Sequence, residues 1–379
     1  MSKRILIIDN SLYVTGALKS VVASSTELSD EFEFLFVLPK ASLASPWVES
    51  RGFKAYELPF LELSRKPMSF LLYLPTLLKN GLLLKKLIRD KNIELVHGND
   101  LYNLAIFAAS ISGSVVPFVT HIRFLPDKFP QLLFRLWLWL HFRFARRVIA
   151  VSYFQANRLP ANRKLTMIYD KLPEDVMPSA RKESDGARIL LYISNTIPGK
   201  GLEYAVDVFS KLSKEFPEWR LRFVGGDMGL PKNRAYKDML QARCQEVGIA
   251  LKTEWSDFTD DVAAEYVAAD IALNFSESES FSRTTVEALF FGCPIVATAC
   301  GGPSEIVDHG RTGFLVPVGD VPLMVSSVRQ LMKDDLLRAR FSQEGQKSVR
   351  RKFAAENTSD KLRQVYKTVL LDSLSEKND

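Results

Sequence analysis

The stretch DIALNFSESESFSRTTVEALFFGCPIVAT, residues 270–298, decides the fold. An apolar run of strand character ends near residue 275, and a serine-rich loop follows it. A helical apolar pattern then leads through Gly-Cys-Pro to a second β-branched run. Strand, helix and strand in this order are typical of parallel sheets that are covered by helices. We therefore predict an α/β fold around this segment.

The same alternation extends over most of the chain, whose 379 residues are enough for two domains. Strands are predicted at residues 4–9, 33–38, 94–97, 117–120, 148–151, 166–169, 188–193, 220–224, 270–275, 294–298 and 313–316. A clear amphipathic helix is predicted at residues 201–215, where apolar residues form one stripe.

Residues 171–188 are predicted to be a linker, because they combine two prolines, a glycine and many charges with little apolar periodicity. We therefore expect two doubly wound, Rossmann-like domains, at residues 1–180 and 181–355, that face each other across a cleft. A further helix is expected at residues 356–379. Ligands of such sheets bind at the carboxyl ends of the strands, so the cleft is the expected site.

Composition excludes several other classes of protein. Hydrophobic residues make up 47% and charged residues 25%, which is typical of a folded globular chain. The three cysteines lack the paired spacing of a zinc or redox site, so we expect no metal there and a reducing, cytoplasmic setting. The start of the chain does not resemble a signal peptide. The most apolar stretch is interrupted by arginines, so we expect no membrane-spanning helix.

Positive charge is concentrated in the first half of the chain. Residues 1–180 contain 23 Lys and Arg against 15 Asp and Glu, whereas residues 181–379 contain 27 against 29. Scattered solvated charge is our first interpretation of this asymmetry, and contact with an anionic membrane surface or a phosphorylated substrate is the second. No zinc-finger, RRM or basic-zipper signature is present, so no nucleic-acid partner is expected.

Residues 126–147 mix Trp, Phe and Leu with four arginines, which is the composition of an interfacial helix. Apolar residues nonetheless occur nearly all round the expected helix. A buried helix that leads into the strand at residue 148 is therefore our first interpretation. Peripheral contact with the inner face of a cytoplasmic membrane is the second.

Two glutamates within residues 270–298 are candidates for ligand binding. Glu279 lies in the polar loop, and Glu287 lies about one turn into the following helix. The start of that helix can bind an anion through its N–H groups and its dipole. A carboxylate beside a diphosphate would be repelled, so each glutamate is expected to accept hydrogen bonds from neutral hydroxyls. A nucleotide sugar offers such hydroxyls on both sides of its phosphates.

This segment resembles the E-x7-E motif of the retaining GT-B glycosyltransferases of the family 4 type. The similarity continues through ESFS, VEAL, GCP, IVAT, GGPSEIV and HGRTGFLVP, within residues 270–317. It implies that Glu279 holds hydroxyls of the donor sugar and that Glu287 binds the ribose. It also implies that the backbone amides of Phe281 and Ser282 meet the sugar or a phosphate.

Upstream, residues 192–201 (YISNTIPGKG) resemble the family's loop that brings Lys200 onto the diphosphate. Asn195 stands where the family often has an arginine that also pairs with the phosphates. We expect Arg283, at the start of the anion-binding helix after Glu279, to supply the missing charge, with a side chain that points to solvent as the alternative. Glu305 occupies the acidic position of the family's G-G-x-x-E element. Alternatively, Glu305 only complements a helix dipole.

The first half of the chain resembles the family in outline. Gly16 lies in the small-residue loop expected near the donor phosphates, and the family's second glycine is Ala17 here. A generic strand-to-helix turn is the alternative for this loop. His121, directly after the strand at residues 117–120, resembles the family's crevice histidine, with a structural histidine as the alternative. Arg123 is expected to meet an acceptor phosphate. In relatives, a helix like that at residues 356–379 crosses back onto the first domain.

The resemblance implies transfer of a hexose, with retention at the anomeric carbon, from a nucleotide-diphosphate donor to a hydroxyl acceptor. We expect a lipid-linked, lipopolysaccharide or polysaccharide glycan as acceptor, with a free small molecule as the alternative. The chain contains no D-x-D sequence, so the reaction is expected to need neither a metal nor another cofactor. Two alternatives remain, namely a sugar-nucleotide epimerase of the same fold and a non-catalytic partner subunit of a glycosyltransferase.

Overall fold

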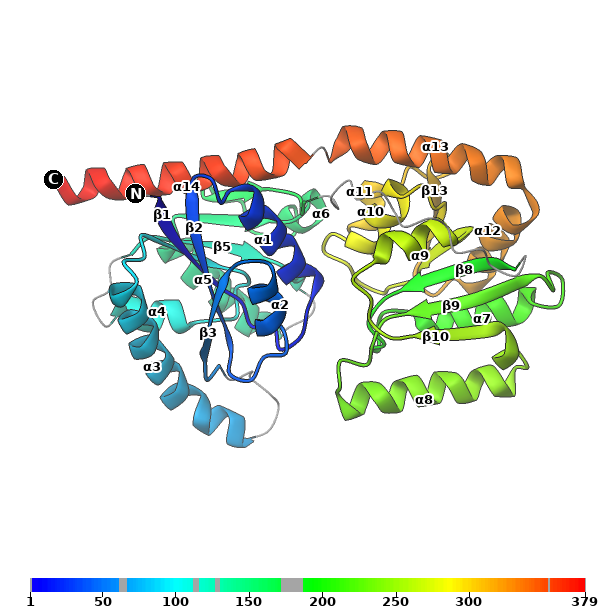
Figure 1. Ribbon diagram of the computed structural model, residues 1–379, viewed down its shortest axis with the longest axis horizontal. Helices are drawn as coiled ribbons and strands as arrows, with labels where there is room; N and C mark the ends of the chain where they lie inside the picture. Colours follow the sequence, from blue (N-terminus) through cyan, green and yellow to red (C-terminus); the bar gives the residue numbers. More distant parts are fainter. Residues whose placement is uncertain are drawn as a thin grey trace. The chain divides into compact units, whose positions relative to one another are not determined.

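The computed structural model describes residues 2–60, 67–111, 116–126, 130–171, 187–353 and 355–378. The chain divides into two compact units. Unit 1 consists of Met1–Lys171 with Ala355–Asp379, and unit 2 consists of Leu172–Ala354. Each unit is built around one parallel sheet with helices on its faces (Figure 1). The predicted α/β fold with two doubly wound sheets is thus confirmed.

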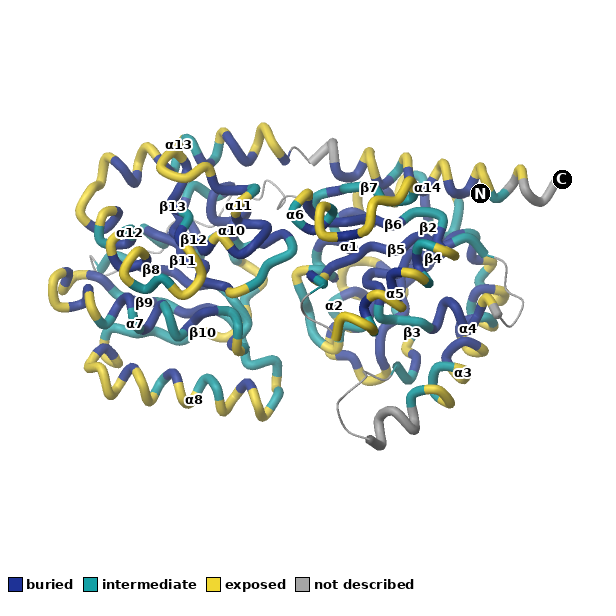
Figure 2. Tube along the Cα trace, turned by 180° about the vertical axis from the view of Figure 1, so that it is seen from behind, coloured by how far each residue is buried: buried dark blue, intermediate teal, exposed yellow. Residues whose placement is uncertain are grey.

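In the described residues of unit 1, seven parallel strands pair in the order β3-β2-β1-β4-β5-β6-β7. The strands are β1 (Lys3–Ile8), β2 (Phe32–Pro39), β3 (Lys54–Leu58), β4 (Leu95–Gly98), β5 (Phe118–Ile122), β6 (Arg147–Ala150) and β7 (Leu165–Met167). Central strands such as β1 are buried on both faces, which explains their continuous apolar sequence. Figure 2 shows the strands as the buried centre of the unit.

Two layers of helices cover this sheet. The layer on one face consists of α1 (Gly16–Glu27), α2 (Ser45–Ser50) and α14 (Ala355–Asn378). The layer on the other face consists of α3 (Pro67–Asp90), α4 (Ala105–Ile111) and α5 (Gln131–Phe144). The short helix α6 (Tyr153–Ala156) follows β6. Helix α14 packs beside α1 and contributes Leu362, Val365, Tyr366, Val369 and Leu370 to the core (Figure 1).

Helix α5 corrects one prediction. Its buried residues Phe134, Trp137, Leu138 and His141 form one stripe that packs on the sheet. On the opposite side Leu132 is 84% exposed and Trp139 is 60% exposed. The first interpretation of residues 126–147, a buried helix, is therefore wrong for α5, because only one face of the helix rests on the sheet. In the part of the chain that is described, no helix is both long and apolar enough to cross a membrane.

In the described residues of unit 2, six parallel strands pair in the order β10-β9-β8-β11-β12-β13. The strands are β8 (Arg188–Ile193), β9 (Trp219–Val224), β10 (Thr253–Ser256), β11 (Ile271–Asn274), β12 (Ile295–Thr298) and β13 (Gly313–Val316). The helices are α7 (Leu202–Leu212), α8 (Pro231–Glu246), α9 (Val262–Ala268), α10 (Arg283–Phe290), α11 (Pro303–Ile306), α12 (Val321–Lys333) and α13 (Asp335–Lys352).

Helix α7 buries the stripe that its periodicity predicts, namely Leu202, Ala205, Val206, Phe209 and Leu212. All eleven predicted strands are found within a few residues of their predicted bounds. The prediction missed β3 and β10, which are the edge strands of their sheets. In both units the first strand lies beside the fourth, and the strand order reverses there. In open sheets of this kind, ligands bind at the carboxyl ends of the strands at that reversal.

Candidate functional site

The candidate site in unit 2 lies where the order of the strands reverses, between β8 and β11. These two strands pair in parallel, so their carboxyl ends meet at the same edge of the sheet. Lys200 follows β8, and Glu279 follows β11. The topology of the sheet therefore brings the two loops predicted from the sequence to one place.

Tyr192, near the end of β8, ties these two loops together. Its hydroxyl donates a hydrogen bond to the carbonyl of Lys200 and accepts one, at 2.7 Å, from the backbone N–H of Phe275. Burial raises the pKa of Tyr192, which keeps the phenol protonated as a donor. Gly201 lies against the same strand end, since a Cβ at this position would be 2.0 Å from the carbonyl oxygen of Phe275. The loop that carries Lys200 is thus held in close contact with β11.

Lys200 and Glu279 form an ion pair, with Nζ 2.7 Å from Oε1. Their side chains are 30% and 14% exposed, so the pair is accessible to a ligand. The backbone around Glu279 is fixed, because its N–H donates to the carbonyl of Cys300 at 3.2 Å and its carbonyl accepts from Gly302 at 2.9 Å. Burial raises the pKa of Cys300 to about 11, so this neighbouring thiol stays protonated. The cation and the carboxylate are therefore positioned before any ligand binds.

Helix α10 begins beside Glu279. Ser282 precedes it with φ +81°, a left-handed conformation that is strained for a serine. Asn274 donates to the Ser282 hydroxyl at 2.8 Å and to the Thr285 hydroxyl at 3.1 Å, and these interactions fix the start of the helix. The Ser282 side chain does not cap the first turn. The N–H groups of that turn are the kind of donors that bind anions at helix ends.

Arg283 and Glu287 form a second ion pair one turn along α10, with Nη2 3.1 Å from Oε1. Both side chains are largely buried. Nη1 of Arg283 is also buried and has no hydrogen-bond partner among the described residues. Asn195 lies in the loop after β8, and its carbonyl accepts from the N–H of Ile197 at 2.9 Å. Arg283 is the cation expected to replace the arginine that the family often has at position 195. Its charge is thus partly neutralised by Glu287.

The remaining candidates of unit 2 lie in the loop between β11 and α10 and after β12. Phe281 is buried, and its ring packs edge-on against Phe353 with centroids 5.7 Å apart. The carbonyl group of Phe281 lies close to Gly302, since a Cβ added at position 302 would be 1.9 Å from the carbonyl oxygen. Glu305 is in the first turn of α11, and its carbonyl accepts a hydrogen bond from Lys352. Within the described residues, no group of three or more His, Cys, Asp and Glu side chains is arranged to hold a metal ion.

In unit 1, Gly16 is the exposed first residue of α1. Thr15 caps this helix by accepting a hydrogen bond from the N–H of Leu18 at 3.2 Å. The Ser11 hydroxyl lies 3.0 Å from the Thr15 hydroxyl and links the start of the loop to the cap. Gly16 therefore stands at the carboxyl end of β1, beside the start of a capped helix.

The position predicted for His121 is wrong. Strand β5 extends to Ile122 because it pairs with β6 as far as Ala150, so His121 lies inside the strand. Its ring is buried and stacks on His97 with centroids 5.6 Å apart. Neither ring nitrogen of His121 has a partner among the described residues. Burial lowers the pKa of His121 well below its usual value, so the ring is neutral.

Arg123, the expected acceptor contact, is buried in a polar network after β5. It forms an ion pair with Asp170, and its Nε donates to Oδ1 of Asn99 at 2.8 Å. Asn99 in turn donates to Asp9, which follows β1. The sequence analysis missed these partners of Arg123. The sequence did contain a signal for this network. The pairs Asp-Asn at residues 9–10 and Asn-Asp at residues 99–100 directly follow two strands that are neighbours in the sheet.

Burial also raises the pKa of Asp100, in the loop after β4, to about 8. Such a carboxyl group is largely protonated at neutral pH. The carboxyl edge of the unit 1 sheet thus gathers one arginine and several buried acids. The carboxylate of Asp170 balances the charge of Arg123. The expected contact between Arg123 and an acceptor phosphate did not take this buried network into account.

Solved structures identify the fold to which these sheets and loops belong. The Anabaena protein HepE, solved in complex with UDP-glucose, has a TM-score of 0.80 at 20% identity, over 96% of this chain and 99% of that one. Sucrose-phosphate synthase from Thermosynechococcus elongatus has a TM-score of 0.80 at 17% identity, over 98% and 100% of the two chains. The fold is that of the GT-B glycosyltransferases.

Sequence comparison then finds matches to two family models. The model for glycosyl transferases group 1 matches residues 175–348, and the model for glycosyltransferase family 4 matches residues 43–169. The chain thus matches the glycosyl transferases group 1 family over residues 175–348, which include strands β8 to β13.

Two curated relatives have established names. N-acetyl-alpha-D-glucosaminyl L-malate synthase of Bacillus anthracis is 28% identical over 59% of this chain and 60% of its own length. D-inositol 3-phosphate glycosyltransferase of Corynebacterium efficiens is 28% identical over 48% of this chain and 42% of its own length. The chain thus spans about half the length of these two relatives.

Proposed function

We propose that the protein transfers a sugar from a nucleotide-diphosphate donor to a hydroxyl group of an acceptor. The matches to the two glycosyltransferase family models support this proposal, as do the relatives whose names are those of glycosyltransferases. The observation that carries it is the ion pair between Lys200 and Glu279, beside the start of α10 and at the reversal of the strand order. A cation, a carboxylate and a helix N-terminus together match the charges and hydroxyls of a nucleotide sugar.

In this proposal each group takes a different part of the donor. The ammonium group of Lys200 binds the diphosphate, together with the backbone N–H groups of Phe281 and Ser282. The carboxylate of Glu279 accepts hydrogen bonds from hydroxyls of the sugar, and that of Glu287 accepts them from the ribose. As the glycosidic bond breaks, negative charge grows on the departing diphosphate. Donors that are already in place stabilise this charge most effectively.

The proposed stereochemical outcome is retention. The acceptor hydroxyl attacks on the face from which the diphosphate leaves, and an oxygen of that diphosphate accepts the proton of the hydroxyl. Glu279 is not assigned as a nucleophile, because its carboxylate is engaged by Lys200. Arg283 and Glu305 are proposed as further donor contacts. The buried Nη1 of Arg283 has no hydrogen-bond partner among the described residues, and a phosphate oxygen is the partner that we propose for it.

We propose further that residues 1–180 carry the acceptor site and residues 181–355 the donor site, with the helix at 356–379 belonging to the acceptor-binding part. Gly16 is proposed near the donor phosphates, His121 at the reaction centre and Arg123 at an acceptor phosphate. The proposed acceptor is a lipid-linked or polysaccharide glycan at the cytoplasmic face of a membrane. The excess of basic residues in the first half of the chain supports this acceptor class.

The test is a screen of labelled nucleotide sugars for release of nucleoside diphosphate, first without and then with glycan acceptors. The wild type, Lys200→Ala and Glu279→Gln are compared with Lys211→Ala, which changes an exposed lysine on α7 of the same unit. We expect release by the wild type and by Lys211→Ala only. Conversion of the donor sugar without consumption of acceptor would instead indicate an epimerase. A folded protein that turns over no donor would indicate a non-catalytic subunit.

A further inference from the structure

The outer face of α5 carries exposed apolar side chains. Leu132, Leu136 and Trp139 are spaced at i, i+4 and i+7, so they lie on one side of the helix. All three are at least half exposed. Arg135 and Arg143 are exposed beside them, and the sequence of α5 contains no acidic residue. A helix with this combination is typical of a membrane interface.

Helix α3 repeats the pattern in the same helix layer. Leu74, Leu78 and Leu82 are spaced at i, i+4 and i+8 and are each more than half exposed. Helices α3 and α5 pack through one apolar cluster on the same face of the sheet. Their exposed stripes therefore both belong to the outer side of this layer. Exposed positions along α3 are visible in Figure 2.

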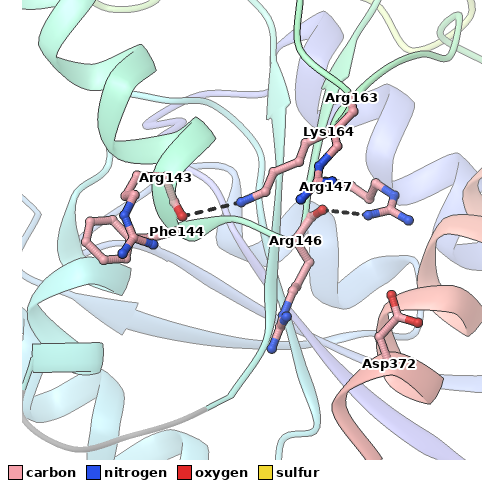
Figure 3. Close-up of a pocket in the computed structure, with 7 residues that line it drawn as sticks. All are labelled: Arg143, Phe144, Arg146, Arg147, Arg163, Lys164 and Asp372. Atoms are coloured by element: carbon pink, nitrogen blue, oxygen red, sulfur yellow. Dashed lines mark hydrogen bonds between the residues drawn. The ribbon is translucent and has the colours of Figure 1, made fainter. Parts of the chain in front are cut away.

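A hollow of about 650 Å³ lies at the carboxyl end of α5, and we refer to it as the basic hollow (Figure 3). Its lining comes from the end of α5, the start of β6, the loop before β7 and α14. Among the described residues, five cations and one carboxylate line it: Arg143, Arg146, Arg147, Arg163, Lys164 and Asp372, with Phe144 beside them.

The cations in the basic hollow are close enough to affect one another. The pKa of Lys164 is lowered, first by desolvation and then by the charges of the neighbouring arginines. Its Nζ donates to the backbone carbonyls of Phe142 at 2.9 Å and Arg143 at 3.3 Å. These carbonyl contacts orient the lysine but do not neutralise its charge. The basic hollow therefore has the charge of a site for a multiply charged anion.

The basic hollow and the polar network around Arg123 lie at opposite edges of the unit 1 sheet. Arg147 begins β6, and Lys164 directly precedes β7. These two strands are parallel neighbours, so the hollow lies at the amino ends of the strands. The polar network around Arg123 lies at the opposite, carboxyl edge of the same sheet. A ligand in the basic hollow would leave that edge uncovered.

We propose that the exposed stripes of α3 and α5, together with the basic hollow, dock this protein on an anionic lipid bilayer. A bilayer offers both partners at once, with lipid phosphates for the cations and acyl chains for Leu132, Leu136 and Trp139. A second copy of this chain is a poor occupant, because a symmetric contact would bring the two sets of cations together. The proposal gives a location to the membrane part of the proposed function, and it does not depend on the transfer reaction.

The experiment is co-sedimentation of the full chain with vesicles of phosphatidylcholine alone and of equal parts phosphatidylcholine and phosphatidylglycerol. We expect binding to the anionic vesicles only, and weaker binding as salt increases. Each basic residue near such a surface is worth about 1 kcal/mol, so Arg146→Ala with Arg163→Ala is expected to weaken binding roughly thirty-fold. Lys211→Ala with Lys214→Ala removes the same charge from unit 2 and is expected to leave binding unchanged.

A second pair of variants tests the apolar contribution. Leu132 and Leu336 are helical leucines that are both 84% exposed, and they lie in different units. Leu132→Ala is expected to weaken vesicle binding, and Leu336→Ala is not. Thermal unfolding of each variant verifies that it is folded. Release of nucleoside diphosphate without vesicles is measured in parallel, so failure of the proposed function is seen separately.

Three outcomes would overturn the docking proposal. The first is equal binding to both kinds of vesicle, and the second is equal loss in the variants of the hollow and in their controls. The third is calorimetric binding of inorganic phosphate in the hollow by a protein that binds no vesicles. That result would assign the basic hollow to a soluble anion.

Discussion

Nζ of Lys200 lies 2.7 Å from Oε1 of Glu279, although 79 positions separate the two residues in the chain. The parallel pairing of β8 and β11 produces this contact, since it places the ends of both strands at one edge of the sheet. Tyr192 then holds the two loops together through the carbonyl of Lys200 and the N–H of Phe275. The pair is thus built into the framework of unit 2.

Lys200→Ala tests the contribution of this cation. Removing one group that stabilises developing negative charge reduces turnover by about 100-fold or more. We expect a loss of this size in kcat/KM for nucleoside diphosphate release and partial activity in Lys200→Arg. Lys211→Ala is the control, because it removes an exposed lysine from the following helix. Equal losses in Lys200→Ala and Lys211→Ala would contradict a specific role.

Arg283→Ala tests whether Arg283 compensates for Asn195. If its buried Nη1 contacts a phosphate, the variant weakens donor binding, and Asn195→Arg added to it restores part of the affinity. Initial rates at several donor concentrations give KM and kcat for each variant. The compensation hypothesis fails if Arg283→Ala leaves donor affinity and turnover unchanged while Lys200→Ala abolishes them.

Gly302→Ala tests the close packing of the loop that carries Phe281. The added Cβ would lie 1.9 Å from a carbonyl oxygen, and backbone atoms cannot move aside easily. We expect a loss of about 3 kcal/mol or more in the free energy of unfolding, at the upper end for overpacking. In Gly226→Ala the nearest atom is 3.7 Å from the new Cβ, so this control should unfold like the wild type. Denaturant titration measures both variants, and similar midpoints would refute the expected clash.

Tyr366→Ala tests the contribution of α14 to unit 1. Tyr366 is fully buried, and its hydroxyl lies 2.6 Å from Nδ1 of His97. Truncating a large buried ring costs about 3–5 kcal/mol. Leu371→Ala, on the same helix but 66% exposed, is expected to have little effect. Deleting residues 356–379 should destabilise unit 1 further, and unchanged stability and activity after this deletion would contradict the packing of α14.

The buried histidines predict how stability depends on pH. Burial lowers the pKa of His97 from 6.5 to about 3 and that of His141 to about 4. At these two histidines the unfolded chain binds more protons below pH 6.5, so their contribution to stability is complete above that pH and decreases on acidification. Each histidine contributes about 1.4 kcal/mol per pH unit until its pKa in the folded state is reached. Asp100, whose pKa burial raises to about 8, acts in the opposite direction, because its folded form keeps a proton that the unfolded form has lost. Thermal unfolding between about pH 7.5 and about pH 5.5 measures the decrease, because the lowered pKa values of the two histidines place it in that range.

His121→Leu separates the two interpretations of His121. If the residue is structural, the variant removes two unpartnered ring nitrogens, keeps its stability at neutral pH and loses less stability on acidification than the wild type. If the residue acts at the reaction centre, kcat falls while the unfolding midpoint at neutral pH is unchanged. Rates and unfolding curves on the same preparation distinguish these results.

The sequence predicted the central strands well, because a strand buried on both faces is a continuous apolar run. The central strand β8 (RILLYI) has the bounds that its apolar run predicts, and so does the edge strand β13 (GFLV), which is apolar and mostly buried. The edge strands β3 (KAYEL) and β10 (TEWS) are instead half polar. Only their pairing with a neighbour reveals them as strands, and single-sequence periodicity does not contain that information.

The parts of the site that a local sequence pattern encodes could be predicted. The contacts between residues far apart in the chain could not. The loops of Lys200 and Glu279 could be placed at strand ends from the sequence, whereas their direct contact depends on strand pairing. The partners of Arg123 were missed because Asn99 and Asp170 come from other strand ends. In α5, apolar residues on all sides concealed which face meets the sheet. His121 was misplaced because β5 is extended by its pairing with β6.

The central claim is that Lys200 and the start of α10 bind the diphosphate of a nucleotide sugar. Calorimetric titration of the wild type and Lys200→Ala with a panel of nucleoside diphosphates tests it most directly. We predict that the wild type binds at least one member of the panel and that Lys200→Ala binds it about 10- to 100-fold more weakly, the loss expected when one charged hydrogen-bond donor is removed. Equal affinity in the two proteins, or no binding of any nucleoside diphosphate by the folded wild type, would contradict the claim.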